Sequence, residues 1–325
     1  MKSAVCTLFE GSYHHGLAAL ANSLQGTGFA GTLYAGYRGV LPAWAAAAAP
    51  LPLPGWPEAS SLPVGEHLRI TFLPLRTAYH LTNLKPRFML ELLDGPLARP
   101  GAEVEALFYI DPDICALGRW SYFEDWVGCG VALCEDLNSP LPENHPRRVA
   151  WRRYYGERGL TLRYRASDYV NGGFVGVRRA DRAFLECWQR TMELMAEEIG
   201  SLAAAKVGGG AAYRSTGPAD CFDCSDQDAL NAAVEACGLD VSVMGQEAMA
   251  FKPGRALLPH AVGAAKPWQR GYLRAAFGGV APRQADKAYW AHAQSPITSH
   301  GAWQRLLRRI DLVAASAVGR LVRRS

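Results

Sequence analysis

The first forty residues contain a strand, a helix and a second strand, and this order constrains the fold more than any other feature. Residues 4–9 are apolar throughout, which is typical of a parallel strand covered on both faces. Apolar residues at helical spacing predict a helix over 16–24, and residues 32–37 predict the next strand. This succession predicts an α/β sheet, and such sheets bind ligands beyond the carboxyl ends of their strands.

The loop after the first predicted strand lies at that ligand edge. Glu10 and Tyr13 in this loop are candidates to contact the base or the ribose of a nucleotide. No G-x-G-x-x-G sequence is present there, so the dinucleotide-binding fingerprint is absent. We therefore expect a ligand site that is built from other residues.

Two carboxylates follow a second apolar run. Residues 106–110 end in Asp111-Pro112-Asp113, which places both acids at the carboxyl edge of the predicted sheet. Paired hard oxygen donors at this edge suit a divalent cation that carries phosphates. An ordinary acidic turn is the alternative, because short motifs of this kind also occur without a ligand.

A helix is predicted over 83–93, with Asn83 as its N-cap and Gly95 after its end. Lys85 and Arg87 fall in the first turn, where cations are unfavourable against the helix dipole. A bound anion would explain them, and solvent exposure is the alternative. Lys85 is accordingly a candidate ligand-binding residue.

Two segments interrupt the alternation of strands and helices. Residues 41–63 carry six prolines and five consecutive alanines, which predicts a surface excursion with at most one short helix. Residues 136–165 hold a basic and aromatic cluster, which indicates either a helix with a solvated face or the lining of an acceptor groove. The cluster consists of Arg147, Arg148, Trp151, Arg152, Arg153, Tyr154 and Tyr155.

Composition excludes several classes of protein. The chain has 325 residues, 49% of them hydrophobic and 20% charged, so it can bury a substantial core and is too apolar to be disordered. The net charge of +4 is too small to indicate a partner nucleic acid. No apolar run reaches the ~18 residues of a bilayer span, and the first apolar run is too short for a signal peptide. We therefore expect a cytoplasmic protein.

The chain contains eight cysteines, of which only Cys221 and Cys224 are closely spaced. A zinc site usually takes four ligands, and no second pair accompanies this one. Several of the other cysteines lie in apolar runs, where a free thiol behaves as a small hydrophobic group. This usage indicates a reducing compartment.

Four short motifs rich in Asp, Gly and amide side chains follow one another along the chain: Tyr109-Ile110-Asp111-Pro112-Asp113, Asn171-Gly172-Gly173-Phe174-Val175, Asp226-Gln227-Asp228-Ala229-Leu230-Asn231, and His260 with Gly263 and Lys266-Pro267-Trp268. In this order they resemble glycosyltransferase family eight, the retaining group that includes glycogenin and bacterial lipopolysaccharide galactosyl- and glucosyltransferases. The resemblance covers about residues 3–270. It implies a GT-A fold, a Rossmann-like mixed α/β sheet flanked by helices that binds a nucleotide-sugar and Mn²⁺ or Mg²⁺.

The resemblance implies roles for individual residues at the metal and the phosphates. Asp111, Asp113 and His260 match the protein ligands of the metal, and Lys266 with neighbouring Gly263 matches the segment at the donor diphosphate. The chemistry is consistent with this, because oxygen donors and one imidazole are reasonable ligands for Mn²⁺. A divalent cation and a lysine also suit the negative charge that develops on a leaving diphosphate.

Other matches lie at the transferred sugar. Asp226 and Gln227 match the family's pair beside the reacting centre, and Asn171 and Gly172 match a loop that contacts the donor sugar. The chain departs from the family in its first loop, which lacks the Asp residues that many members carry. The residues that contact the base are therefore the least defined part of the predicted site.

The C-terminal tail has the pattern of a basic amphipathic helix. Arginines flank an apolar stripe at i, i+3, i+4, i+7 spacing, which indicates that residues 303–324 contact an anionic membrane surface. A helix docked on the domain, or a dimer contact, is the alternative. The stripe is Trp303, Leu306, Leu307, Ile310, Val313, Ala314, Ala317, Val318 and Leu321, and the arginines are Arg305, Arg308, Arg309, Arg320, Arg323 and Arg324.

We predict a GT-A catalytic domain over 1–275 and a C-terminal helical extension over 276–325. The predicted activity is that of a metal-dependent retaining glycosyltransferase, which moves a hexose from a nucleotide-diphosphate sugar, a UDP-sugar in the first instance, to a carbohydrate or lipid-linked acceptor. The basic tail adds the expectation of peripheral binding at the inner face of a membrane. One alternative is a sugar-nucleotide nucleotidyltransferase, whose Gly-rich activation loop has no good match near the N-terminus. The other is a non-catalytic, membrane-associated sugar-nucleotide-binding protein.

Overall fold

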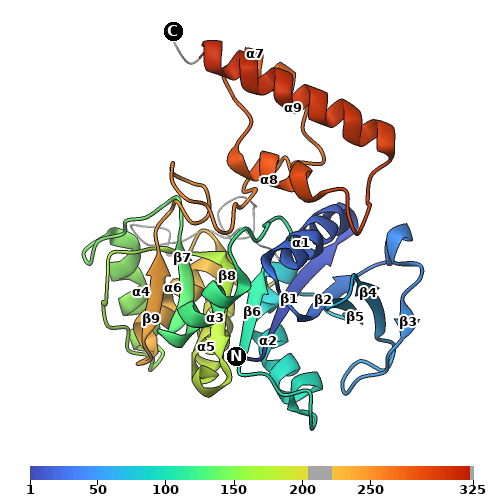
Figure 1. Ribbon diagram of the computed structural model, residues 1–325. Helices are drawn as coiled ribbons and strands as arrows, with labels where there is room; N and C mark the ends of the chain where they lie inside the picture. The colour runs from blue at the N-terminus through green and yellow to red at the C-terminus, as the bar shows by residue number, and fades with distance from the viewer. Residues whose placement is uncertain (204–221, 323–325) are drawn as a thin grey trace.

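The computed structural model describes residues 1–203 and 222–322, in which helices lie on both faces of one mixed sheet (Figure 1). In these residues the sheet has nine strands in the order β3-β4-β5-β2-β1-β6-β8-β7-β9. The strands are β1 (Ser3–Glu10), β2 (Gly31–Arg38), β3 (Ala49–Pro50), β4 (Ser60–Val64), β5 (Leu68–Pro74), β6 (Ala106–Ile110), β7 (Val131–Glu135), β8 (Val170–Arg178) and β9 (Val241–Met244). The α-helices are α1 (His14–Thr27), α2 (Lys85–Asp94), α3 (Trp120–Gly128), α4 (Pro146–Glu157), α5 (Ala183–Ile199), α6 (Ser225–Ala236), α7 (Tyr272–Phe277), α8 (Gln284–His292) and α9 (Ala302–Val322).

The direction of the strands decides which residues meet at the ligand edge. β1, β2, β5 and β6 run parallel to their neighbours in that part of the sheet, whereas β8 runs antiparallel to both β6 and β7. The first residues of β8 therefore meet the last residues of β6, with Phe174 opposite Ile110. This reversal brings two of the sequence motifs together at one edge.

The sheet is buried on both faces, as the apolar first strand predicts. Cys6 and Leu8 of β1 pack with α2, α4, α5 and α6, whereas Val5 and Phe9 pack with α1 and α3. Successive side chains of a strand point to opposite faces, so one strand contributes to both cores. All residues of β6 are buried as well.

The proline-rich segment was expected to stay outside the sheet, and this expectation is wrong. β3 and β4 pair antiparallel with each other, and β4 pairs with β5, so the segment extends one edge of the sheet. Pro50 and Pro63 are tolerated because this is the edge of the sheet, where a missing backbone N–H costs little. The alanine run forms no α-helix, because a 3-10 turn over Ala43–Ala45 ends at its first residue and β3 begins at its last residue, Ala49.

Two local expectations on helices need correction. Asn83 is not the N-cap of α2, because a 3-10 turn over Leu81–Leu84 precedes that helix and the Asn83 amide donates to the carbonyl of Leu202 at 2.9 Å. The basic and aromatic cluster does form a helix, α4, but Trp151 and Tyr155 on it are fully buried in the core. Their burial removes the expected groove lining at these two positions.

The C-terminal extension packs on α1 through a separate apolar cluster that includes Trp268, Tyr289 and Trp290. The Asn22 amide ties the two parts together, because it donates to the carbonyls of His292 and Ile297 at 2.7 and 2.8 Å. The predicted boundary at residue 275 falls inside α7, which packs against α9.

α9 lies at the far end of the extension (Figure 1), and much of its apolar stripe is exposed to solvent. Its opposite side packs on the extension, where Ala315 is fully buried. No helix within the described ranges is both long and apolar enough to cross a bilayer. Cys221, Arg323 and Arg324 lie outside the described residues. The exposed stripe residues are Trp303, Leu306, Leu307, Ile310, Val313 and Leu321.

Candidate active site

A pocket of about 440 Å³, here called the acidic pocket, lies at the carboxyl ends of β1, β6 and β7. It brings together every residue that the sequence proposed for the site, from segments far apart along the chain. These residues are Glu10, Tyr13, Lys85, Asp111, Asp113, Asn171, Gly172, Asp226, Gln227, His260, Gly263 and Lys266. Placement in one pocket does not assign roles, which follow from the contacts below.

Backbone pairing fixes the two acids and the distant histidine beside each other. The Asp111 N–H donates to the Gly173 carbonyl at 2.8 Å, directly after β6. Ile114 forms an isolated antiparallel bridge with His260, and the Ala261 N–H donates to the Asp113 carbonyl at 3.1 Å. The segment that carries His260 is therefore held against the turn that carries the acids.

Asp111, Asp113 and His260 each offer one ligand atom, and these atoms all lie within 4.8 Å of one another. The His260 Nε2 atom is 3.3 Å from Asp113 Oδ1 and 3.9 Å from Asp111 Oδ2. Two carboxylates and one imidazole make a donor set that suits Mn²⁺, and carboxylate oxygens also suit Mg²⁺. The arrangement therefore fits a divalent cation.

Asn171 orients the histidine for this purpose. Its Oδ1 atom accepts from the Gly173 N–H at 2.8 Å and lies 3.1 Å from His260 Nδ1, while its Nδ2 donates to Asp136 Oδ2 at 2.6 Å. Because Oδ1 is an acceptor, the contact places an imidazole proton on Nδ1, so Nε2, which faces the two carboxylates, is the nitrogen available to a metal. Partners of this kind commonly orient metal-binding histidines.

Two lysines neutralise the acids. Lys266 Nζ donates to Asp113 Oδ2 at 2.6 Å, and Lys85 Nζ donates to Asp226 Oδ2 at 2.8 Å and lies 3.3 Å from Asp111 Oδ1. Lys85 is 1% exposed. The alternative that its side chain is exposed to solvent is therefore wrong. A cation in the first turn of a helix is unfavourable against the helix dipole. The carboxylates of the acidic pocket compensate for this cost at Lys85.

These contacts shift the pKa values of three groups. Burial opposes the charged form of Asp113, but His260 and Lys266 outweigh it and hold the pKa of this carboxyl below its ordinary value. Burial likewise opposes the charge on Lys85, yet Asp111 and Asp226 raise its pKa above the ordinary value. The pKa of Lys266 is raised against burial mainly by Asp113. Asp113 and both lysines are therefore charged at neutral pH.

The glycines of β8 leave room for side chains of the acidic pocket. A Cβ atom on Gly173 would lie 2.6 Å from His260 Cε1, and one on Gly172 would lie 2.9 Å from Asp226 Oδ2. The Gly172 backbone is also used on both sides, because its carbonyl accepts from Lys85 at 2.8 Å and its N–H donates to Gln227 Oε1 at 3.2 Å. Any larger residue would displace the histidine or the acid.

The first loop forms another wall of the acidic pocket. Glu10 pairs with Arg38 at 2.6 Å, and the Tyr13 ring lies 5.6 Å from Lys266 Nζ and packs edge-on against Trp268. Gly263 adopts a φ of +96°, a conformation that favours glycine. This loop and the Gly263 turn thus flank Lys266.

Sequence reasoning missed several polar residues of the pocket, among them Asp136 and His80. Asp136 directly follows β7 at the same edge and fixes Asn171. The rule that identified Asp111 would have found it, because it also ends an apolar strand. His80 follows β5 within an irregular segment, where no pattern marks it.

Comparisons with known proteins show which fold this is. A scan against protein-family models and a search of curated proteins each gave no match. Among solved structures, the chain is similar to the galactosyltransferase LgtC in complex with donor and acceptor sugar analogues, with a TM-score of 0.53, 16% identity and coverage of 93% of this chain and 99% of that chain. An active-site mutant of LgtC matches with a TM-score of 0.50, 14% identity and the same coverage.

This chain has the GT-A fold. The similarity confirms the predicted α/β architecture, with a mixed sheet and helices on both faces. At 16% identity it establishes the fold and not the reaction. Within this GT-A fold, the chemistry depends on the residues of the acidic pocket.

Proposed function

We propose that the protein is a metal-dependent, retaining glycosyltransferase that moves a hexose from a nucleotide-diphosphate sugar to a carbohydrate or lipid-linked acceptor. The observation that carries the proposal is the convergence of Asp111, Asp113 and His260 on one point, with Lys266 beside them. The resemblance of the four motifs to glycosyltransferase family eight favours retention of configuration and a UDP-sugar. The LgtC complex, which holds donor and acceptor sugar analogues, supports two sugar substrates.

In this reaction the bond between the hexose C1 and the diphosphate oxygen breaks and C1 forms a bond to an acceptor hydroxyl oxygen, whose proton passes to the leaving diphosphate and from there to solvent. Asp111, Asp113 and His260 would hold Mn²⁺ or Mg²⁺, which supplies Lewis-acid stabilisation of the diphosphate. Lys266 donates to the same leaving group when it turns from Asp113, which is 2.6 Å away. Fixed cations are effective here because negative charge develops on the diphosphate as it leaves.

Asp226 and Gln227 lie on the sugar side of the proposed site. Lys85 binds Asp226, and the Gln227 side chain accepts from the Gly172 N–H, so both are held in place before any substrate binds. Such preorganisation avoids the cost of orienting polar groups during the reaction. We assign this pair and Asn171 to contacts with the transferred hexose.

The C-terminal helix favours an acceptor at a membrane. Trp303, Leu307 and Val313 of α9 are exposed, and the helix also carries arginines. An apolar face with basic flanks binds anionic lipid surfaces in the interfacial plane. We therefore place the protein peripherally at the inner face of a membrane, where a lipid-linked sugar acceptor would be available.

A donor screen tests the proposal. Melting temperatures are measured with UDP-, GDP-, ADP- and dTDP-hexoses, each with Mn²⁺ or with EDTA, for the wild type and for Asp113→Asn. We expect one nucleotide-sugar to raise the melting temperature of the wild type only with Mn²⁺ and to have no effect on the variant. If no nucleotide-sugar raises it, the proposed function is wrong.

A further inference from the structure

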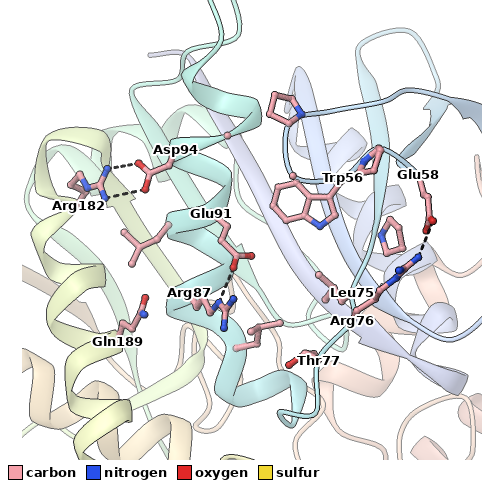
Figure 2. A pocket seen from close by; sticks show the side chains of 17 residues that line it. Trp56, Glu58, Leu75, Arg76, Thr77, Arg87, Glu91, Asp94, Arg182 and Gln189 are labelled. Carbon is pink, nitrogen blue, oxygen red and sulfur yellow. Dashed lines mark hydrogen bonds and ion pairs between the residues drawn. The ribbon is translucent and has the colours of Figure 1, made fainter.

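A second and larger cavity lies apart from the acidic pocket, and it is here called the α2 groove. It has a volume of about 930 Å³. Figure 2 shows the exposed side of α2 in the middle, α5 on one side, and the segments around Trp56 and Leu75 on the other. A volume of this size matches sites for small molecules and cofactors.

Within the described part of the chain, every arginine that lines the groove is paired with a carboxylate that also lines it. Arg182 makes two contacts with Asp94, at 2.5 and 3.2 Å, and Arg87 contacts Glu91 at 2.7 Å (Figure 2). A third pair lies on the opposite wall, where Arg76 Nη2 is 2.9 Å from Glu58 Oε1. Counted over the described residues, the lining is therefore balanced in charge, with three cations against three anions. An anionic ligand would meet a carboxylate beside each guanidinium, so phosphates and nucleic acids are poor candidates.

The same pairs present many hydrogen-bond donors and many hydrogen-bond acceptors. Guanidinium groups only donate and carboxylates only accept, while the Gln189 amide on α5 does both. A ligand with many hydroxyls can use both kinds at once, because each hydroxyl donates and accepts. Neutral carbohydrates have this property along their whole length.

The remaining lining is apolar and stiff. Leu75, Leu84 and Leu90 lie between the polar pairs, and Pro54 and Pro57 stand beside the buried Trp56. Apolar lining of this kind suits the C–H faces of pyranose rings, while a few placed polar groups fix orientation. We propose that the α2 groove is a binding site for a neutral oligosaccharide.

The groove and the acidic pocket share one wall. Thr77 and Leu84 line the groove, whereas His80 and Lys85 of the same segment line the acidic pocket. Arg38 stiffens this segment, since its Nη1 donates to the carbonyls of Thr77 and Tyr79. A chain of sugars with one end at the acidic pocket would have to cross this wall to enter the groove. The groove would then hold the distal part of an extended acceptor. This acceptor role rests on the proposed function, whereas the binding of an oligosaccharide in the groove does not.

The test measures binding without donor or metal. Wild-type protein in EDTA is applied to an array of neutral, sialylated and sulfated oligosaccharides, and the best neutral ligand is titrated calorimetrically. Arg182→Ala removes a donor from the groove and Gln189→Trp fills it. Arg178→Ala is the matched control, because Arg178 and Arg182 have equally exposed side chains (39%) but Arg178 pairs with Asp181 outside the groove.

We expect a neutral oligosaccharide to bind, with affinity at least about tenfold weaker in each groove variant, and within about twofold of wild type in Arg178→Ala and Asp113→Asn. Melting temperatures establish that each variant is folded. The inference is overturned if no neutral oligosaccharide binds, if only anionic ones bind, or if the groove variants bind as the wild type does. If the wild type binds a neutral oligosaccharide in the groove but transfers no sugar, only the proposed function is refuted. If it transfers a sugar but binds no oligosaccharide in the groove, only the proposed groove site is refuted.

Discussion

The carboxylate of Asp113 contacts Lys266 and His260 through different oxygen atoms. Lys266 Nζ lies 2.6 Å from Oδ2, and His260 Nε2 lies 3.3 Å from Oδ1. One acid thus joins the residue proposed for the diphosphate to the proposed metal site. Most of the predictions below depend on this relationship.

Asp113→Asn should abolish metal-dependent activity. The amide keeps the shape of the side chain but loses its charge, so we expect transfer to fall by at least about 100-fold and calorimetric Mn²⁺ binding to be lost. The variant also leaves the Lys266 charge without its partner, which should lower the free energy of unfolding by roughly 3 kcal/mol. Asp125→Asn, on the exposed side of α3, is the control and should change none of these three quantities.

Lys266→Met should slow the chemical step. If Lys266 stabilises charge on the leaving diphosphate, its removal should lower kcat by roughly 100-fold, since a single charge-stabilising donor has about this effect. Steady-state rates of nucleoside diphosphate release measure it. Lys252→Met, which removes an exposed lysine, serves as control. A Lys266→Met enzyme with unchanged kcat would show that this lysine is only a structural partner of Asp113.

Tyr272→Phe should loosen the segment that carries Lys266. The Tyr272 hydroxyl donates to the Pro267 carbonyl at 2.9 Å and accepts from Trp290 at 3.0 Å, so the extension holds the residue next to Lys266. Loss of these buried contacts should cost about 1–2 kcal/mol of unfolding free energy, measured by urea denaturation. Tyr122→Phe, whose hydroxyl lies at the surface, should cost less than about 0.5 kcal/mol. Equal losses in the two variants would contradict the predicted role of the extension.

The histidines at the base of the extension should make the protein sensitive to acid. His15 stacks on His300 at 4.2 Å, and burial together with neighbouring His14 lowers the pKa of His15 to about 3. Burial, and to a smaller extent His14, Arg305 and Arg308, lower the pKa of His300 to about 4. The unfolded chain takes up these protons near pH 6.5. Stability from this pair is therefore complete above about pH 6.5 and is lost as the pH falls toward 3–4.

A double variant measures this effect. The unfolding free energy of wild type should fall between pH 6.5 and 4 more steeply than that of His15→Gln with His300→Gln, whatever their absolute stabilities. His67→Gln, at an exposed site, should keep the wild-type slope. Equal slopes in the wild type and the double variant would contradict the argument.

Much of the site could be predicted because its residues lie at strand ends. Asp111 and Asp113 follow a fully apolar strand, and this position alone indicated the ligand edge. That Asn171 would reach the same edge depended on β8 running antiparallel, which no local pattern reveals. Only the family resemblance predicted that Asn171 lies at the same site as Asp111 and Asp113, because residues so far apart in the chain share no local sequence pattern.

Other features escaped prediction because they are set by tertiary contacts. Lys85 has the sequence context of a solvated first-turn residue, yet it is buried because Asp111 and Asp226 approach from other elements. Pro50 and Pro63 argue against strands, but an edge position makes them acceptable. The α2 groove has no motif at all, since its walls come from segments that meet only in the folded chain.

The rate of nucleoside diphosphate release from a hexose donor, with and without Mn²⁺, tests the central claim most directly. The donor found in the melting screen is incubated with an oligosaccharide acceptor, first in EDTA and then after Mn²⁺ is added in excess. We predict release at the background rate in EDTA, full recovery with Mn²⁺, and no recovery in Asp113→Asn. Release at the same rate in EDTA, or a fully active Asp113→Asn variant, would contradict a metal-dependent glycosyltransferase built on Asp111, Asp113 and His260.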